Sequence, residues 1–155
     1  SVVGRRMGRI PVILAVGAPR ASRVHIFEWG VNSIAWRESR IDLKWIGECA
    51  YPKSNHCNFD MYVGQTERDG VEARIALRMR QSNNVHLFHR LGNETTWIND
   101  SVGSADMAHL SGDGMVLALL NQGNRFITKH DFSGDGTPVF VHFNRVINAK
   151  AIALS

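Results

Sequence analysis

Two cysteines and a neighbouring histidine are the residues of this 155-residue chain whose types and spacing most readily suggest chemistry. Cys49 and Cys57 lie eight positions apart, and His56 directly precedes the second cysteine. Thiolate and imidazole groups bind zinc, but this spacing fits no common zinc pattern and a fourth ligand is not evident. A secreted, disulfide-stabilised domain would normally hold more cysteines. We therefore expect two free thiols, with no metal and no cofactor.

The other polar residues form no catalytic pattern. Seven histidines are spread along the chain, and none has an acidic or nucleophilic partner at a characteristic spacing. The tetrapeptide Ser-Gly-Asp-Gly occurs at 111–114 and at 133–136, where it indicates turns rather than a pair of catalytic carboxylates. Two acceptor patterns for N-linked glycosylation, at 93–95 and 99–101, are short, and the cysteine usage indicates an intracellular protein, so we discount them.

Composition indicates one globular domain with a basic surface. Hydrophobic residues make up 44% of the chain and charged residues 21%, and a chain of this length suits a single domain spanning 1–155. The net charge is +4, with arginines clustered at 5–9 and 74–80, so RNA contact through the basic surface is one expectation. No apolar run reaches the length of a membrane span.

Patterns of apolar residues predict many short strands. Apolar residues alternate with others over 71–79, and the turn Ser82-Asn83-Asn84 then leads to an apolar stretch at 85–88, which predicts a hairpin. Further strands are predicted at 10–16, 41–46, 59–63, 115–120, 125–128 and 138–146. Pro19 and Gly30 predict a helix over 19–29, and a second helix is expected from about residue 148. Many strands with two helices near the ends favour a β-barrel.

A weak internal repeat suggests a different architecture. Val-His-Ile-Phe at 24–27 and Val-His-Leu-Phe at 85–88 are each followed, nine residues after the phenylalanine, by a tryptophan, Trp36 or Trp97. Repeats of this kind occur in propellers, in which a sheet cannot bury its faces without its neighbours. A lectin-like or propeller-type binding module is therefore one alternative, although the spacing is uneven and a third copy is not evident.

Several short motifs, taken in order, resemble the cyclophilins, the family of peptidyl-prolyl isomerases. They are Met-Gly-Arg-Ile at 7–10, Pro-Arg-Ala-Ser at 19–22, Phe-Asp-Met-Tyr-Val-Gly-Gln-Thr at 59–66, Ala-His-Leu-Ser-Gly-Asp-Gly-Met-Val at 108–116 and Arg-Phe-Ile-Thr at 125–128. The resemblance implies a mainly β fold, a cyclophilin-like antiparallel β-barrel capped by two helices. The stretch at about 72–100 has no counterpart in these motifs and is expected to be an insertion.

The resemblance also implies a peptide-binding pocket, and its key positions are altered in this chain. The family's catalytic arginine has no match, and Lys53 stands nearest to its place without the planar guanidinium. The pocket glutamine falls on Val63 and the pocket histidine on Pro138, which leaves Met61 and Phe126 as degenerate pocket walls. We therefore expect no catalytic residue, with residual isomerase activity as an alternative.

The ends of the chain complete this interpretation. Matched to the family, the chain holds little of the barrel's first strand and none of its last, which predicts an open seam with bare edges near 10–14 and 143–147. A catalytically inactive cyclophilin-like domain that acts as a structural or protein-binding component of a larger assembly would fit these features. The basic charge suggests a ribonucleoprotein such as a mitochondrial ribosome, and hence a mitochondrial location, with the cytoplasm as the alternative.

Overall fold

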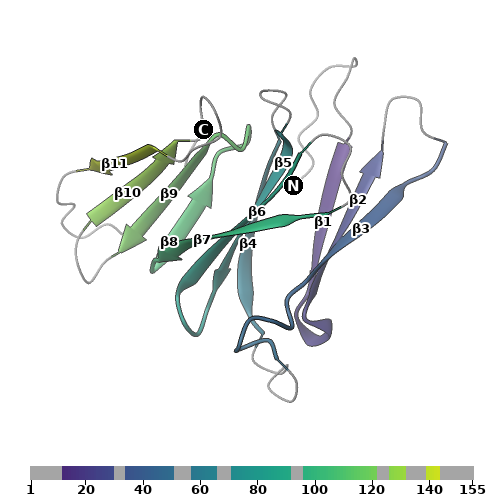
Figure 1. Ribbon diagram of the computed structural model, residues 1–155, viewed down its shortest axis with the longest axis horizontal. Helices are drawn as coiled ribbons and strands as arrows, with labels where there is room; N and C mark the ends of the chain where they lie inside the picture. Colours follow the sequence, from purple (N-terminus) through teal and green to yellow (C-terminus); the bar gives the residue numbers. More distant parts are fainter. Residues whose placement is uncertain are drawn as a thin grey trace. The chain divides into compact units, whose positions relative to one another are not determined.

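The computed structural model describes residues 12–29, 34–50, 57–65, 71–91, 96–121, 126–131 and 139–143. The described residues form eleven strands and one short 3-10 helix, and all of the strand pairs are antiparallel (Figure 1). The fold is therefore mainly β, as the sequence predicts. The chain divides into two compact units, residues 1–58 and 59–155, and each is described by itself.

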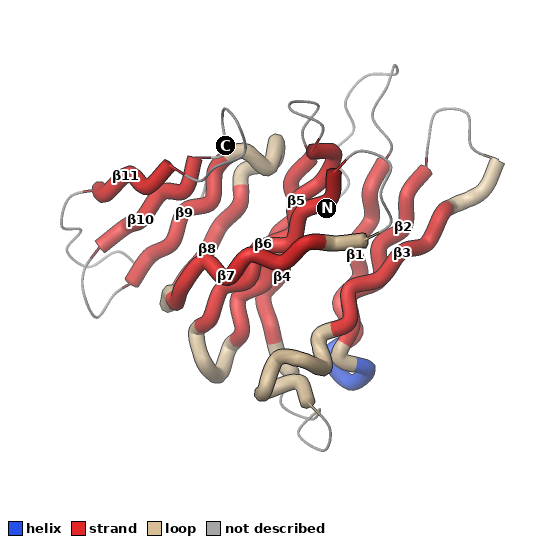
Figure 2. The backbone as a smooth tube through the Cα atoms, in the orientation of Figure 1, coloured by secondary structure: helices blue, strands red, loops and turns tan. Residues whose placement is uncertain are grey.

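Unit 1 holds one sheet of three strands, which we call sheet A. Its strands are β1 (Val12–Ala18), β2 (Arg23–Trp29) and β3 (Arg37–Asp42), in the order β1-β2-β3. One turn of 3-10 helix, η1 (Pro19–Ala21), connects β1 to β2 and is the short blue segment in Figure 2. On β2, Val24, Ile26 and Glu28 are buried, whereas the residues between them are more exposed, so one side of sheet A is covered.

Unit 2 holds two sheets of four strands, and each strand pairs with the next one along the chain. Sheet B consists of β4 (Phe59–Gln65), β5 (Val71–Met79), β6 (Asn84–Leu91) and β7 (Ile98–Ser104). Sheet C consists of β8 (Met107–Leu110), β9 (Val116–Asn121), β10 (Phe126–Asp131) and β11 (Val139–Phe143). Both sheets are therefore simple meanders, and no closed barrel forms among the described strands.

The facing sides of sheets B and C share a hydrophobic core. Its buried members are Ala76, Val85, Leu87, Ala105, Ala108, Leu110, Leu117 and Leu119, with Tyr62 and Val102 packed against them. Apart from Ala105, which lies between β7 and β8, the buried members lie on β5, β6, β8 and β9, and those that share a strand alternate along it, as expected for strands that present one side to a core. Burial of one large apolar side chain stabilises a fold by about 1.5–3 kcal/mol, so this cluster supplies much of the packing energy of unit 2.

A close backbone contact fixes sheet B against sheet C. The amide of Gln65, at the end of β4, donates a hydrogen bond to the carbonyl of Gly112 in the turn between β8 and β9, at 3.1 Å. A Cβ atom on Gly64 would meet the carbonyl oxygen of Ser111 at 2.6 Å and would also overlap the backbone of Gly114. The buried Arg74 completes the contact by donating to the carbonyl of Gly114 at 2.9 Å. Only glycine fits at position 64 in this arrangement.

The Ser-Gly-Asp-Gly turn at 111–114 holds its own shape. The carboxylate of Asp113 accepts hydrogen bonds from the Ser111 hydroxyl at 2.6 Å and from the Met115 amide at 2.9 Å. The Ser111 oxygen in turn accepts the amide of Val116, and Gly114 takes a positive φ of 71°. The prediction of a turn is confirmed here, whereas the second copy, at 133–136, lies outside the described residues.

The predicted helix over 19–29 is wrong. The chain makes one 3-10 turn after Pro19, Ser22 adopts a left-handed conformation with φ 51°, and β2 follows at once. The alternation of buried Val24, Ile26 and Glu28 has a period of two, which a strand satisfies and a helix does not. Proline sets the first turn of a helix but does not carry the helix further. The second expected helix, from about 148, lies outside the described residues.

The strand predictions are largely confirmed. The strand at 71–79 is β5 as predicted, and the hairpin turn is also correct, with Asn83 at φ 57° before β6. The prediction over 41–46 is wrong, because β3 ends at Asp42 and its carboxylate accepts the amide of Lys44 in a turn. The stretch 72–100, expected to be an insertion, supplies most of β5, all of β6 and the start of β7.

The contact at Gly64 gives a direct test of how the two sheets of unit 2 are held. Replacement of Gly64 by alanine forces a methyl group into the backbone of the 111–114 turn, so we expect a loss of about 1–3 kcal/mol in unfolding free energy. Urea denaturation followed by tryptophan fluorescence measures this loss. Gly112→Ala, on the same turn but with nothing within 4 Å of the added methyl group, is the matched control and should stay within about 1 kcal/mol of the parent. Equal effects of the two substitutions would contradict the proposed contact.

Candidate functional site

Sheet A presents an exposed apolar surface on its edge strand. Val12, Leu14 and Val16 of β1 are 46%, 40% and 43% exposed and lie on one side of the strand, because alternate residues share a side. Their cross-strand partners on β2 are Trp29, Phe27 and His25, respectively. We call these six residues the apolar face. Contiguous exposed apolar residues on a folded protein mark an interaction surface more often than single ones do.

Aromatic and charged side chains border the apolar face. Trp36 is 49% exposed and lies against Trp29, with the two ring centroids 5.5 Å apart. On β3, Glu38 and Arg40 are the cross-strand partners of Phe27 and His25, and the Glu38 carboxylate lies 2.8 Å from the Nδ1 atom of His25. The surface therefore has an apolar centre, an exposed tryptophan pair and a charged strand along one side. This arrangement is typical of protein-binding surfaces.

The opposite side of sheet A carries an ion pair between a buried glutamate and an exposed arginine. The side chain of Glu28 is only 3% exposed, and its carboxylate accepts two hydrogen bonds from the guanidinium of Arg37, at 2.9 and 3.2 Å. A buried carboxylate requires a partner of this kind, because an unpaired buried charge is strongly destabilising. This pair therefore stabilises β2 and β3 and is not available for chemistry.

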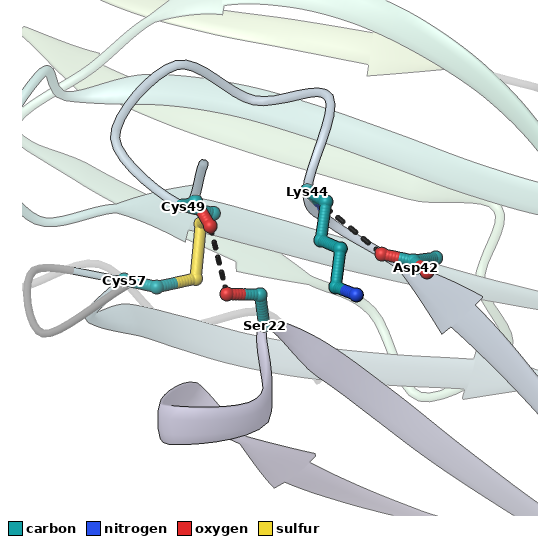
Figure 3. Close-up of a disulfide and its surroundings, with 5 residues drawn as sticks. All are labelled: Ser22, Asp42, Lys44, Cys49 and Cys57. Carbon is teal, nitrogen blue, oxygen red and sulfur yellow. Dashed lines mark hydrogen bonds between the residues drawn. A yellow bond between two sulfur atoms is a disulfide. The ribbon is translucent and has the colours of Figure 1, made fainter. Parts of the chain in front are cut away.

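The two cysteines form a disulfide, so the expectation of free thiols is wrong (Figure 3). Cys49 and Cys57 are both buried, and the hydroxyl of Ser22 donates a hydrogen bond to the carbonyl of Cys49 at 2.8 Å. The turns that follow β3 are thereby linked to the turn before β2, since the Leu43 amide also donates to the Ser22 carbonyl. An even number of cysteines at a short separation is compatible with a disulfide, but spacing alone does not reveal how closely the two side chains approach.

Unit 2 contains a cluster of charged and polar side chains at one end of its sheets. The carboxylate of Asp60 on β4 accepts hydrogen bonds from Arg78 at 2.7 Å and from Arg80 at 2.7 and 2.9 Å. Arg78 also donates to the backbone carbonyl of Ala105 and to the side chain of Asn83, both at 3.0 Å. Each acceptor of this cluster therefore has a donor that the fold supplies.

These contacts give the cluster a structural role. Arg78 connects sheet B to the segment that leads into sheet C, and the Asn83 carbonyl accepts the Ala105 amide at 2.8 Å beside it. Both carboxylate oxygens of Asp60 accept hydrogen bonds from these arginines, so the group is engaged in contacts that hold the strands together. Among the residues that the structure describes, no three His, Cys, Asp or Glu side chains are placed to hold a metal ion.

Tyr62 lies beside this cluster, and its pKa is shifted by its surroundings. Burial raises the pKa of the Tyr62 phenol, and the negative charge of Asp60 raises it further, while Arg78 and Arg80 act in the opposite direction. The ring packs against the core of unit 2 and against His109, with centroids 5.3 Å apart. A phenol that stays protonated over an unusually wide pH range serves packing rather than proton transfer.

Of the residues expected to line a degenerate peptide pocket, the structure describes the side chains of Met61 and Val63. Met61 and Val63 are half-buried on β4, opposite Leu77 and Ile75 of β5. Tyr62, between them, packs against the core that sheets B and C share, so Met61 and Val63 lie on the other side of sheet B. Phe126 begins β10 in sheet C. Lys53 and Pro138 lie outside the described residues, so their part of the pocket remains a prediction.

The raised pKa of Tyr62 predicts a loss of stability at high pH. The protonated phenol is favoured in the folded state. The contribution of Tyr62 to the unfolding free energy is therefore fully present below about pH 10, and it is lost as the pH rises through the pKa of the folded state. Denaturation midpoints measured from pH 8 to 11.5 in a Tyr51→Phe background, which leaves one tyrosine, should show this fall. The added substitution Tyr62→Phe should flatten the curve, and an equal fall in both proteins would refute the assignment.

Comparisons with known proteins identify no relative of this chain. No protein family, no curated protein and no solved structure gives a significant match. The function must therefore be inferred from the geometry of the chain itself.

Proposed function

We propose that this chain is a non-catalytic binding module of the propeller type, which docks a protein partner on the apolar face of sheet A. The partner presents the apolar side of another antiparallel β-sheet. The order of the strands supports the architecture, and the exposed apolar face supports the mode of binding.

The strand order is the observation that carries the architecture. In each of the three sheets the strands follow one another in the chain, and sheets B and C have four strands each. Antiparallel four-stranded meanders in succession are the repeating units of propellers. Each of the described pairings joins strands that follow one another in the chain, as in such a meander. The strand order therefore supports the propeller-type proposal.

The packing inside unit 2 indicates what would cover the apolar face. There, each four-stranded sheet buries its apolar side against the other through alternating Ala, Val and Leu residues. Sheet A has the same two-residue alternation on β1, yet Val12, Leu14 and Val16 remain 40–46% exposed. A second apolar sheet would cover these residues as sheets B and C cover one another.

The polar groups support the absence of catalysis. The Asp60 cluster uses its donors and acceptors within unit 2, and the Glu28–Arg37 pair does so within sheet A. Within the described ranges no helix has the length and apolar character needed to cross a membrane. A protein-binding component of a larger assembly fits these features, both for a propeller-type module and for an inactive cyclophilin-like domain.

The apolar face predicts self-association, because a second copy of the chain presents the same surface. Leu14→Thr together with Val16→Thr removes apolar contact area but keeps residues that favour strands. If both side chains become buried on association, the loss is about 1.5–3 kcal/mol, or a tenfold to hundredfold weaker dimer. Sedimentation velocity over a range of protein concentrations measures this change.

The matched control for this experiment changes the charged strand beside the apolar face. Glu38→Gln with Arg40→Gln, both exposed on β3, should leave association within about threefold of the parent. A parent chain that stays monomeric at all concentrations, or a threonine variant that associates like the parent, would count against the proposed docking face.

An isomerase assay separates the binding module from a residual prolyl isomerase. The uncatalysed barrier is about 18–20 kcal/mol, and no arginine stands at the position that the family uses to lower it. Exchange of an Xaa-Pro peptide, followed by NMR, should therefore proceed at the same rate with and without micromolar protein. A proline-specific acceleration that disappears in Phe126→Ala would overturn the non-catalytic proposal.

A further inference from the structure

We propose that Asn99 is an acceptor for N-linked glycosylation, and that the chain matures in an oxidising, secretory compartment. Asn99, Asp100 and Ser101 have the acceptor pattern Asn-Xaa-Ser, in which the middle residue is not proline. The pattern is common by chance, so the inference depends on three structural observations.

The first observation is the position of the pattern in the fold. The three residues lie on β7, the last strand of sheet B, which pairs with β6 on one side only. Asp100 and Ser101 are exposed, and Ile98 just before the pattern is 39% exposed. The register shifts just after the pattern, since His86 pairs with Ser101 while Val85 pairs with Gly103. Asn99 itself is half-buried, and it lies on an edge strand, which has a neighbouring strand on one side only.

The second observation concerns the side chain of Asn99. Its carbonyl oxygen is buried and has no hydrogen-bond partner among the described residues, whereas its amide nitrogen is not among the buried, unpartnered atoms. The amide nitrogen is the atom that would carry the sugar. The Asn99 side chain takes part in no hydrogen bond among the described residues. A sugar attached to its amide nitrogen would therefore break no such hydrogen bond.

The third observation is the disulfide between Cys49 and Cys57. Buried structural disulfides form and persist in oxidising compartments and are rare in the cytosol. The expectation of free thiols was the reason to discount the acceptor patterns, and the disulfide removes that reason. The mitochondrial and cytoplasmic locations stay predictions from charge and cysteine usage, and this proposal is an alternative to both.

The modification itself is a group transfer from a lipid-diphosphate-linked oligosaccharide. The Asn99 amide nitrogen attacks the anomeric carbon of the first sugar, and a carbon–nitrogen bond forms as the bond from that carbon to the diphosphate oxygen breaks. The lipid diphosphate leaves, and the amide loses one proton. The cell's transferase supplies the catalysis, and this chain supplies the acceptor.

The experiment expresses the full chain behind a secretion leader in a eukaryotic cell. An Asn93→Gln background removes the other acceptor pattern, so that any N-linked glycan must be attached to Asn99. We expect the protein to be secreted with its disulfide formed, and peptide mass spectrometry to find a glycan at Asn99. Treatment with peptide-N-glycosidase should remove this glycan and abolish the gel-mobility shift that it causes. Asn99→Gln and Ser101→Ala should each abolish the shift.

Two further variants separate the acceptor pattern from effects on folding. Ser101→Thr keeps the pattern and should keep the glycan, and Ser104→Ala, an exposed serine on the same strand, should also keep it. Secretion of disulfide-bonded protein without a glycan at Asn99 would overturn the proposal. Intracellular retention of unmodified chain would overturn it equally, because the proposal requires passage through the secretory compartment.

Discussion

The close approach of β4 to the turn between β8 and β9 is the constraint on which unit 2 depends. Gly64 lies against Gly114 and Ser111 with no space for a side chain, and Gln65 and Arg74 donate hydrogen bonds to the same turn. This contact sets the distance between sheets B and C, and the alanines of the core at 76, 105 and 108 are small enough for it. The glycine and the three alanines thus allow a close approach beside the leucine and valine side chains that fill the rest of the core.

Polar side chains in both units are used to hold strands together. Asp60 and its two arginines link neighbouring strands and connect sheet B to the segment before sheet C, while Glu28 and Arg37 link β2 to β3. Groups that already satisfy one another inside the fold are poor candidates for catalysis. The exposed apolar face of sheet A has no such role within the described residues, which is why it stands out as the surface for binding.

Residue patterns predict the strands of this chain well because strands depend on local alternation. The stretch at 71–79 alternates without interruption and becomes β5 over the same residues. The segment 19–29 misleads because Pro19 and Gly30 suggest helix ends, although Val24, Ile26 and Glu28 alternate between them. Alternation over the whole segment outweighs signals at its ends, and a helix would have placed these three residues on different sides.

The disulfide and the docking surface could not be predicted from the sequence, because both depend on how turns and strands are placed in the folded chain. Whether Cys49 and Cys57 meet depends on how the turns after β3 return to Ser22, which no local pattern encodes. Likewise, Trp29 joins Val12 in the apolar face through the register of β1 and β2. The order of strands in a sheet, which separates a meander from a barrel, is also a long-range property.

Among the strands at the edges of the described sheets, β1 and β7 differ in a way that affects the behaviour of the protein at high concentration. The pairing of β7 is interrupted near Gly103, and Asp100 is exposed beside it, so its free edge is irregular and charged. The pairing of β1 runs without interruption from Val12 to Ala18 and its exposed residues are apolar. Flat apolar edges are templates for intermolecular strand addition, whereas irregular and charged edges resist it. Aggregation should therefore begin at β1 more readily than at β7, and substitutions among the seven residues of β1 are a way to improve solubility.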